Sequence, residues 1–204
     1  MAKLSINTWI SLVLQLLLIS MLPYLIYRRN YLYAIGALLA IFFAYTPAML
    51  KHNFNIQLPW LLEFAIALHM FLHIGGLAFG WYSKFRLYDV VLHIHGTMII
   101  ALLGFMLVYT LYYLGKIKLS LGMIGVFTFL FAIAIGALWE IAEFSLDQSF
   151  GTRAQPSLQD TMGDLIFDGI GGILVAGVGM WYVRKTPERK INKLIGILLN
   201  REVE

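Results

Sequence analysis

The chain has 204 residues, of which 60% are hydrophobic and only 13% are charged. Because soluble domains carry about 25% charged residues, this composition excludes an ordinary water-soluble protein and indicates an integral membrane protein. The net charge of +4 mostly reflects the distribution of basic residues between the two sides of a membrane, and we expect no nucleic-acid partner.

Hydrophobic stretches long enough to cross a bilayer lie near residues 7–27, 31–50, 59–81, 88–114, 121–146 and 161–183. Each is close to the ~20 residues that a helix needs to span the hydrocarbon layer. Strands of a membrane barrel are much shorter, so we predict an all-α fold, a polytopic membrane protein with a bundle of six transmembrane helices. Residues 1–185 would form this transmembrane domain.

Residues 186–204 form a predicted cytoplasmic tail. Ile191, Leu194, Ile195 and Leu198 recur at helical spacing beside basic residues. This pattern is typical of an amphipathic helix that lies on a membrane surface. A solvated tail with frayed structure is the alternative.

Basic residues decide the predicted orientation. With both termini in the cytoplasm, ten Lys and Arg residues lie inside and five lie outside, in line with the positive-inside bias. The inner residues are Lys3, Lys51, Lys116, Lys118, Arg184, Lys185, Arg189, Lys190, Lys193 and Arg201, and the outer ones are Arg28, Arg29, Lys84, Arg86 and Arg153. We therefore predict a multi-pass protein of the cell (inner or plasma) membrane with cytoplasmic N and C termini.

Ionisable residues recur inside the predicted spans, where each costs a few kcal/mol, so such residues are uncommon there and usually pair, bind an ion or line a pathway. In the span 88–114, Asp89 and His93 are four residues apart and share one helix face. His95 is two residues further along and points elsewhere, because positions two apart do not face each other on a helix. Asp89 and His93 are therefore the first candidate pair.

Acidic residues dominate the next two spans. Glu140 and Glu143 are three residues apart, and Asp160, Asp164 and Asp168 form a stripe at i, i+4 and i+8. Two alternatives stay open: the glutamates could be protonated and bonded to each other, and Asp160 alone fits a helix N-cap. Because successive spans run in opposite directions, we expect these groups to meet near the outer surface.

The longest predicted connection runs from about Asp147 to Gln159 and joins the two most acidic spans. It contains Gly151 and Pro156 among polar residues. This composition favours an ordered turn or a lid near the outer surface.

Two further histidines, His69 and His73, are four residues apart in the span 59–81. This spacing can chelate a metal from one helix face, although the glutamate of the metalloprotease motif is missing. His73 lies nearer the outer end and is a candidate ligand. A buried neutral imidazole bonded to a hydroxyl or backbone group is the alternative. Glu63 lies near the inner end and outside the expected site.

The chain has no cysteine, so a metal site must use nitrogen and oxygen ligands. Carboxylates with imidazole suit a divalent ion, and we predict Zn²⁺, Mg²⁺ or Mn²⁺. The predicted ligands are Asp89, His93, Glu140, Glu143, Asp160, Asp164, Asp168 and His73. Glu140 or Glu143 would be the base that assists a metal-bound water, and His93 a ligand or a proton carrier.

The number of candidate ligands indicates either one octahedral ion or a two-metal arrangement, and two metals can hold a phosphate and stabilise both oxygens of phosphoryl chemistry. We therefore predict hydrolysis or transfer on a membrane lipid or a lipid-linked phosphate. Carboxylates and histidines at staggered depths also serve cation or proton transport. A third hypothesis is a non-catalytic structural or accessory protein in which a bound ion ties helices together.

Motifs in the same three spans carry a family resemblance. Tyr88-Asp89-x-x-x-His93, Trp139-Glu140-x-x-Glu143 and Gln159-Asp160-x-x-x-Asp164-x-x-x-Asp168, followed by Gly171 and Gly172, resemble the YjdF-like inner membrane proteins, a family of unknown function. The resemblance covers roughly residues 60–185. More distantly, the chain is similar to VanZ-like proteins, which have an Asp-x-x-x-His, a later acidic residue and an Asp-rich final helix. The resemblance implies the same helical architecture and no mechanism.

Overall fold

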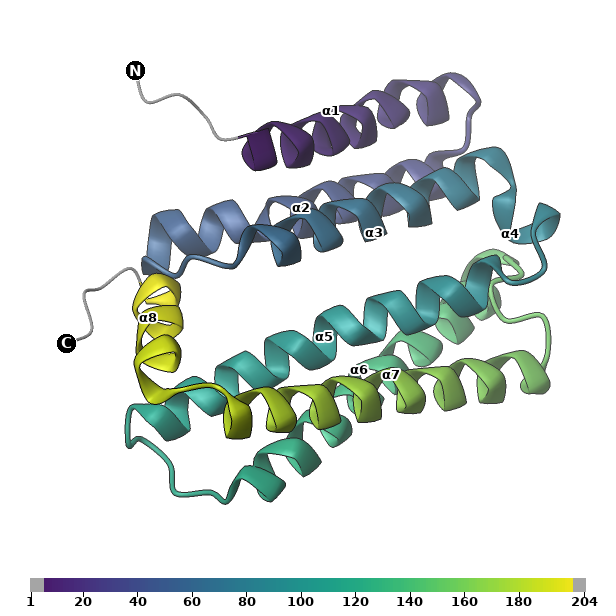
Figure 1. The fold of residues 1–204 in the computed structure, drawn as a ribbon. Helices are drawn as coiled ribbons and strands as arrows, with labels where there is room; N and C mark the ends of the chain where they lie inside the picture. Colours follow the sequence, from purple (N-terminus) through teal and green to yellow (C-terminus); the bar gives the residue numbers. More distant parts are fainter. Residues whose placement is uncertain (1–5, 200–204) are drawn as a thin grey trace. The chain divides into compact units, whose positions relative to one another are not determined.

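A computed structural model describes residues 6–199, and in this part of the chain all regular structure is helical (Figure 1). Six helices are long and apolar enough to cross a membrane: α1 (Ile6–Tyr27), α2 (Tyr31–Phe54), α3 (Trp60–Phe79), α5 (Tyr88–Tyr113), α6 (Leu121–Phe150) and α7 (Leu158–Lys185). Two short helices, α4 (Trp81–Lys84) and α8 (Glu188–Leu198), accompany them. The predicted all-α fold with six membrane-spanning helices is confirmed. Lys3 and Arg201, which entered the predicted orientation, lie outside the described residues.

The connection between α6 and α7 is shorter than predicted. Helix α6 continues to Phe150 and ends at Gly151, whose φ of 66° is easily adopted by glycine and whose N–H donates to the Asp147 carbonyl. Helix α7 begins after Ser157, whose hydroxyl accepts a hydrogen bond from the Asp160 backbone N–H. Ser157 is therefore the N-cap, and Asp160 is not. The connecting segment is residues 151–157, which we call the strap.

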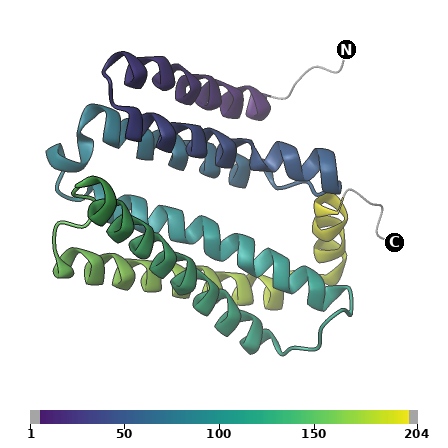
Figure 2. The same ribbon diagram turned by 180° about the vertical axis from the view of Figure 1, so that it is seen from behind.

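Within the described residues, the helices form two compact units, residues 6–92 with 188–199 and residues 93–187. In the first unit, α1, α2 and α3 pack side by side (Figures 1 and 2). Leu18, Met21 and Leu25 of α1 and Ile74 of α3 share a buried core with a stripe of small residues on α2. The stripe consists of Ala34, Ala37, Ala40 and Ala44. Small side chains at this spacing let neighbouring membrane helices approach closely.

The first unit also contains α8, in which Ile191 and Ile195 are buried while Arg189, Lys190 and Lys193 are exposed. The Leu198 carbonyl accepts a hydrogen bond from the Gln57 backbone N–H. A helix is thus present at the position where the sequence predicts an amphipathic one, whereas residues 200–204 of the predicted tail lie outside the described residues. The division of the chain into one transmembrane domain and a tail stays a prediction.

The second unit consists of α5 from His93 onward, α6 and α7. Helix α6 runs obliquely across α7 (Figure 2) and makes its most extensive contacts with it. The two helices approach closely where Gly172 faces Ala132, since a Cβ at position 172 would lie 3.1 Å from the Ala132 Cβ. This close approach holds the acidic end of α7 against α6.

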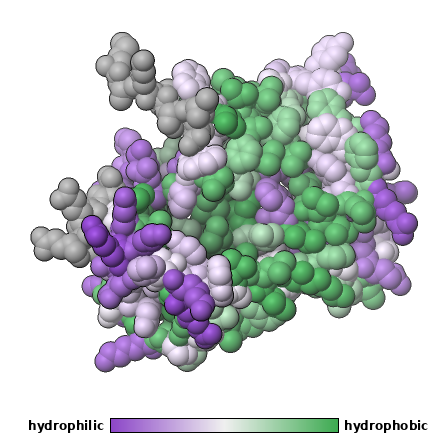
Figure 3. Space-filling model, viewed as in Figure 1, coloured by the Kyte–Doolittle hydropathy of each residue, from purple (hydrophilic) through white to green (hydrophobic). Residues whose placement is uncertain are grey.

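Hydrophobic side chains cover much of the length of the long helices, and hydrophilic side chains gather toward the helix ends (Figure 3). Many large apolar residues on these helices are exposed, among them Leu130, Leu138 and Ile166. Exposed apolar flanks with polar ends are expected of helices whose sides contact lipid chains.

Candidate functional site

His93, on α5 in the second unit, is surrounded by carboxylates from two other helices. Its Nδ1 lies 3.4 Å from Asp168 Oδ1, and its Nε2 lies 3.8 Å from Glu140 Oε1 and 3.9 Å from Asp164 Oδ2. The His93 side chain is only 8% exposed. The two ring nitrogens therefore have different surroundings, one carboxylate on one side and two on the other.

Helix direction and helix period explain why these residues meet. His93 lies near the first turns of α5, Glu140 near the last turns of α6, and Asp164 and Asp168 near the first turns of α7. Because the three helices alternate in direction, these turns lie at one end of the unit. Asp164 and Asp168 are one turn apart on the buried face of α7, with 4% and 1% of their surface exposed.

Asp168 is held on the Nδ1 side of His93. The Thr97 hydroxyl, one turn further along α5, donates a hydrogen bond to Asp168 Oδ1. Oδ2 is buried without a hydrogen-bond partner and lies against Gly136 of α6, where a Cβ would overlap it and would lie 2.9 Å from Asp168 Cγ. Gly136 thus provides the space that this carboxylate occupies.

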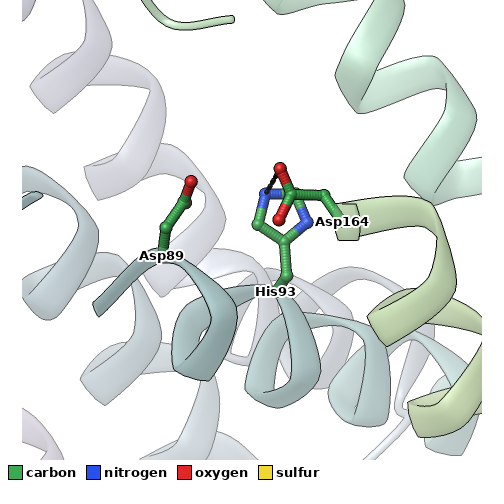
Figure 4. A group of neighbouring side chains, drawn as sticks. All are labelled: Asp89, His93 and Asp164. Carbon is green, nitrogen blue, oxygen red and sulfur yellow. Dashed lines mark ion pairs between the residues drawn. The ribbon is translucent and has the colours of Figure 1, made fainter. Parts of the chain in front are cut away.

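Asp89 joins the Nε2 side. It lies one turn before His93 on the continuous helix α5, and Asp164 reaches the same place from α7 (Figure 4). Ligand atoms of Asp89, His93 and Asp164 lie within 4.8 Å of one another. We call Asp89, His93, Glu140, Asp164 and Asp168 the carboxylate cluster.

The strap forms a hydrogen bond with Glu140 through Oε2, the carboxylate oxygen that is not directed toward His93. Asp147 accepts hydrogen bonds from the Thr152 hydroxyl, from Ala154 N (2.8 Å) and from Gln155 N (2.9 Å). With its backbone fixed in this way, Gln155 donates from Nε2 to both the carbonyl and the Oε2 of Glu140, each at 2.8 Å. The predicted ordered turn is present, and its carboxylate anchor is Asp147.

The remaining predicted ligands are Glu143, Asp160 and His73. Glu143 accepts a hydrogen bond from the Trp139 indole N–H at 3.0 Å on an exposed part of α6. Asp160 lies in the first turn of α7, partly exposed, and interacts electrostatically with His93. His73 belongs to the first unit, where its Nδ1 shares a hydrogen bond of 2.6 Å with the Tyr82 hydroxyl. Metal binding by these three residues stays a prediction.

Gln155 and Gly136 contribute to the site although the sequence did not point to them. A glutamine in a loop has no period that relates it to a helix face. Gly136 offers a weak signal, because it precedes Glu140 by four residues and so lies on the same face of α6. Thr97 follows His93 by four residues and so lies on the same face of α5.

The sequence pattern of the predicted membrane proteins designated DUF2238 matches residues 9–185. The chain belongs to this family. An uncharacterised protein of Thermotoga maritima is 27% identical over 156 residues, which are 75% of this chain and 79% of the relative. No solved structure matches the chain. The family assignment agrees with the six membrane-spanning helices and identifies a multi-pass membrane protein, while the more distant similarity to VanZ-like proteins stays a prediction.

Proposed function

We propose that this DUF2238 protein binds a divalent metal ion in the carboxylate cluster and uses it to hydrolyse or transfer a lipid-borne phosphate. The observation that carries the proposal is the division of His93 between two environments. A metal-binding histidine ordinarily offers one nitrogen to the ion and donates the other N–H to a carboxylate or carbonyl. Asp168 on Nδ1, with Glu140 and Asp164 beyond Nε2, corresponds to that arrangement.

Distance and charge both support an ion on the Nε2 side. Separations of 3.8 and 3.9 Å exceed the roughly 2.7–3.2 Å of a direct hydrogen bond and leave room for an ion between the groups. Four carboxylates around one imidazole also repel one another inside a membrane, where charge is poorly screened. A divalent cation would relieve that repulsion.

The residues of the cluster divide the work in this proposal. Asp89, His93, Asp164 and Glu140 would hold the ion, and a bound Zn²⁺, Mg²⁺ or Mn²⁺ would polarise a phosphate and activate water. Glu140 is the candidate base because Gln155 fixes its Oε2 and leaves Oε1 directed toward His93. Asp168 orients the imidazole. In the predicted orientation, with both termini cytoplasmic in the inner or plasma membrane, the site would face outward.

The first experiment measures bound metal in purified protein by inductively coupled plasma mass spectrometry, before and after Mn²⁺ or Zn²⁺ is added. We expect about one ion per chain in the unmutated protein and a loss of that ion in Asp164→Ala and His93→Ala. The proposal would be contradicted if the unmutated protein contains no metal after purification and binds none when Mn²⁺ or Zn²⁺ is added.

The second experiment measures chemistry in the metal-loaded protein. At a Mn²⁺ concentration that saturates the variant, Glu140→Gln should lose the release of phosphate from phosphatidic acid or a polyprenyl diphosphate. Ion flux in proteoliposomes that disappears in the cluster variants, with no phosphate release, would replace catalysis by transport. Metal binding whose loss lowers only thermal stability would assign a structural role.

A further inference from the structure

A groove of about 320 Å³ lies beside the carboxylate cluster on the second unit. Its lining comes from α6, α7 and the strap and consists of Ala137, Glu140, Ile141, Phe144, Gln155, Thr161 and Leu165. Glu140 therefore belongs to both the groove and the cluster, with Oε2 and its carbonyl bonded to Gln155 and Oε1 directed toward His93. Glu140 itself is only 4% exposed, so the groove and the cluster meet at a side chain that is almost completely buried.

The walls of the groove are apolar and lie on the outer flank of the helices. Ile141 is 59% exposed and Phe144 is 55% exposed. Within a bilayer, an exposed apolar flank of a spanning helix contacts the hydrocarbon chains of lipids, since water is absent at that depth. Hydrocarbon chains of the bilayer can therefore contact the apolar wall of this groove directly.

Three residues that line the groove have polar side chains and four have apolar ones. Glu140, Gln155 and Thr161 are the polar residues, and Ala137, Ile141, Phe144 and Leu165 are the apolar ones. A pocket that is mostly apolar, with a few polar groups that set orientation, suits an amphiphile. The polar end of such a molecule would point toward Glu140 and the ion, and its chain would lie along the apolar wall.

We propose that this groove binds one hydrocarbon chain of a phosphate-bearing lipid, which enters from the bilayer between α6 and α7 and presents its phosphate to the ion in the carboxylate cluster. The part that concerns the headgroup rests on the proposed metal site. Carboxylates alone repel a phosphate, so lipid phosphate and metal should bind cooperatively, each raising the affinity for the other by the same factor. The part that concerns the chain is independent of the metal.

The test uses two lipids with the same acyl chains, dioleoyl phosphatidic acid in its non-hydrolysable phosphonate form and dioleoylglycerol. Their binding to the full-length protein in detergent micelles is measured by native mass spectrometry, with Mn²⁺ or with EDTA. For the unmutated protein, we expect phosphatidic acid to bind about tenfold more tightly with Mn²⁺ than with EDTA. Dioleoylglycerol should bind equally in both conditions.

Ile141→Trp and Ala137→Trp fill the groove with an indole ring, and Leu138→Trp is the matched control because Leu138 is 59% exposed and does not line the groove. Both groove variants should weaken binding of both lipids about tenfold while bound metal stays unchanged. The control should bind lipid and metal normally. Ile141 is already exposed, so Ile141→Trp tests the groove even if Ala137→Trp fails to fold.

The outcomes separate the groove from the metal site. Groove variants that bind both lipids as tightly as the unmutated protein would overturn the lipid site, whatever the metal content. A groove variant that instead changes the oligomeric state would also overturn it, because a second copy of the chain would then occupy the groove. A protein that takes up no metal but loses dioleoylglycerol binding in Ile141→Trp would support the chain site and contradict the proposed function alone.

Discussion

Two histidines on membrane-spanning helices have opposite surroundings in this protein. His73 of α3 shares a hydrogen bond with the Tyr82 hydroxyl, and the Tyr82 ring packs edge-on against Tyr88 at 5.1 Å. The Tyr88 hydroxyl donates to the Leu72 carbonyl at 2.7 Å. We call His73, Tyr82 and Tyr88 the aromatic cluster. His93, by contrast, has Asp168, Glu140 and Asp164 within 3.4–3.9 Å of its ring nitrogens.

The difference does not come from spacing on the helix that carries each histidine. His73 is four residues from His69, and His93 is four residues from Asp89, so each has a polar neighbour one turn away. The difference between the two histidines comes from the elements that pack against each of them. These are α4 and the start of α5 around His73, and the acidic turns of α6 and α7 around His93. Chelating spacing on one helix is therefore a weak predictor of a metal site.

The largest contrast is expected from removing each imidazole. His93→Ala should lower metal affinity by more than about 100-fold. Changing a residue that only orients a ligand costs less, about 10- to 100-fold. His73→Ala should leave metal affinity unchanged and lower the free energy of unfolding by about 1 kcal/mol, the contribution of one hydrogen bond. Isothermal titration with Mn²⁺ and thermal unfolding of both variants check this. Equal metal affinities in the two variants would contradict the assignment of metal binding to the carboxylate cluster.

A glycine in each cluster gives the second contrast. A Cβ at position 136 would overlap the Asp168 carboxylate, and one at position 76 would lie 2.6 Å from Tyr82 and 2.7 Å from Tyr88. Each Gly→Ala change should therefore destabilise the protein by about 1–3 kcal/mol through overpacking. Only Gly136→Ala should also weaken metal binding, because it displaces Asp168 from His93.

Gly177→Ala is the matched control for both glycine variants. No atom lies within 4 Å of a Cβ at position 177. Alanine there should leave metal binding unchanged and leave the protein as stable as before or slightly more stable, by up to about 1 kcal/mol. Weaker metal binding in Gly76→Ala than in Gly136→Ala would contradict the assignment of the two clusters.

The Thr97 hydroxyl provides a smaller contrast. Thr97→Val removes the donor to Asp168 Oδ1 without changing side-chain shape, and metal affinity should fall about tenfold because Asp168 then orients His93 less firmly. Thr97→Ser should restore it. Thr128→Val is the control, since the Thr128 hydroxyl bonds only to the Ile124 carbonyl of its own helix. A Thr97→Val protein with normal metal affinity and reduced stability would reduce Thr97 to a packing role.

The sequence was sufficient where length or period determines structure. Six apolar stretches predicted the six long helices, because crossing hydrocarbon imposes a minimum length. Helix period and alternating direction predicted that Asp89 and His93 would lie at the same end as Glu140 and Asp164, and the structure brings these residues together. Their role as metal ligands stays a prediction.

The sequence was insufficient where local hydrogen bonds determine structure. Glu143 lies about 60° around α6 from Glu140, and the indole of Trp139 binds it on that side. The start of α7 was placed too late, although Ser157-x-x-Asp160 is a recognisable capping pattern. Gln155 reaches Glu140 only because Asp147 fixes the backbone of the strap, and no spacing rule relates a loop residue to a carboxylate on a helix.

Variants of the strap should change metal affinity least. The hydrogen bonds from the strap to Glu140 also distinguish the carboxylate cluster from the aromatic cluster. Gln155→Ala removes both hydrogen bonds to Glu140, so the carboxylate gains freedom and metal affinity should fall by less than about tenfold. Asp147→Asn replaces one of the two carboxylate oxygens that accept hydrogen bonds from the strap. It should also lower metal affinity, by less than Gln155→Ala does. Gln159→Ala, at an exposed position in the first turn of α7, should change nothing.

Titration with Mn²⁺ measures the metal affinity of each strap variant. Thermal unfolding shows whether a variant also lowers the stability of the whole protein, which a change in the orientation of Glu140 alone would not do. If Gln155 positions Glu140, combining Gln155→Ala with Glu140→Gln should cost metal affinity no more than Glu140→Gln alone, because the glutamine acts through the carboxylate. Additive losses would show that the strap supports the helices as a whole. The double variant thus decides whether the strap is part of the site or only part of the fold.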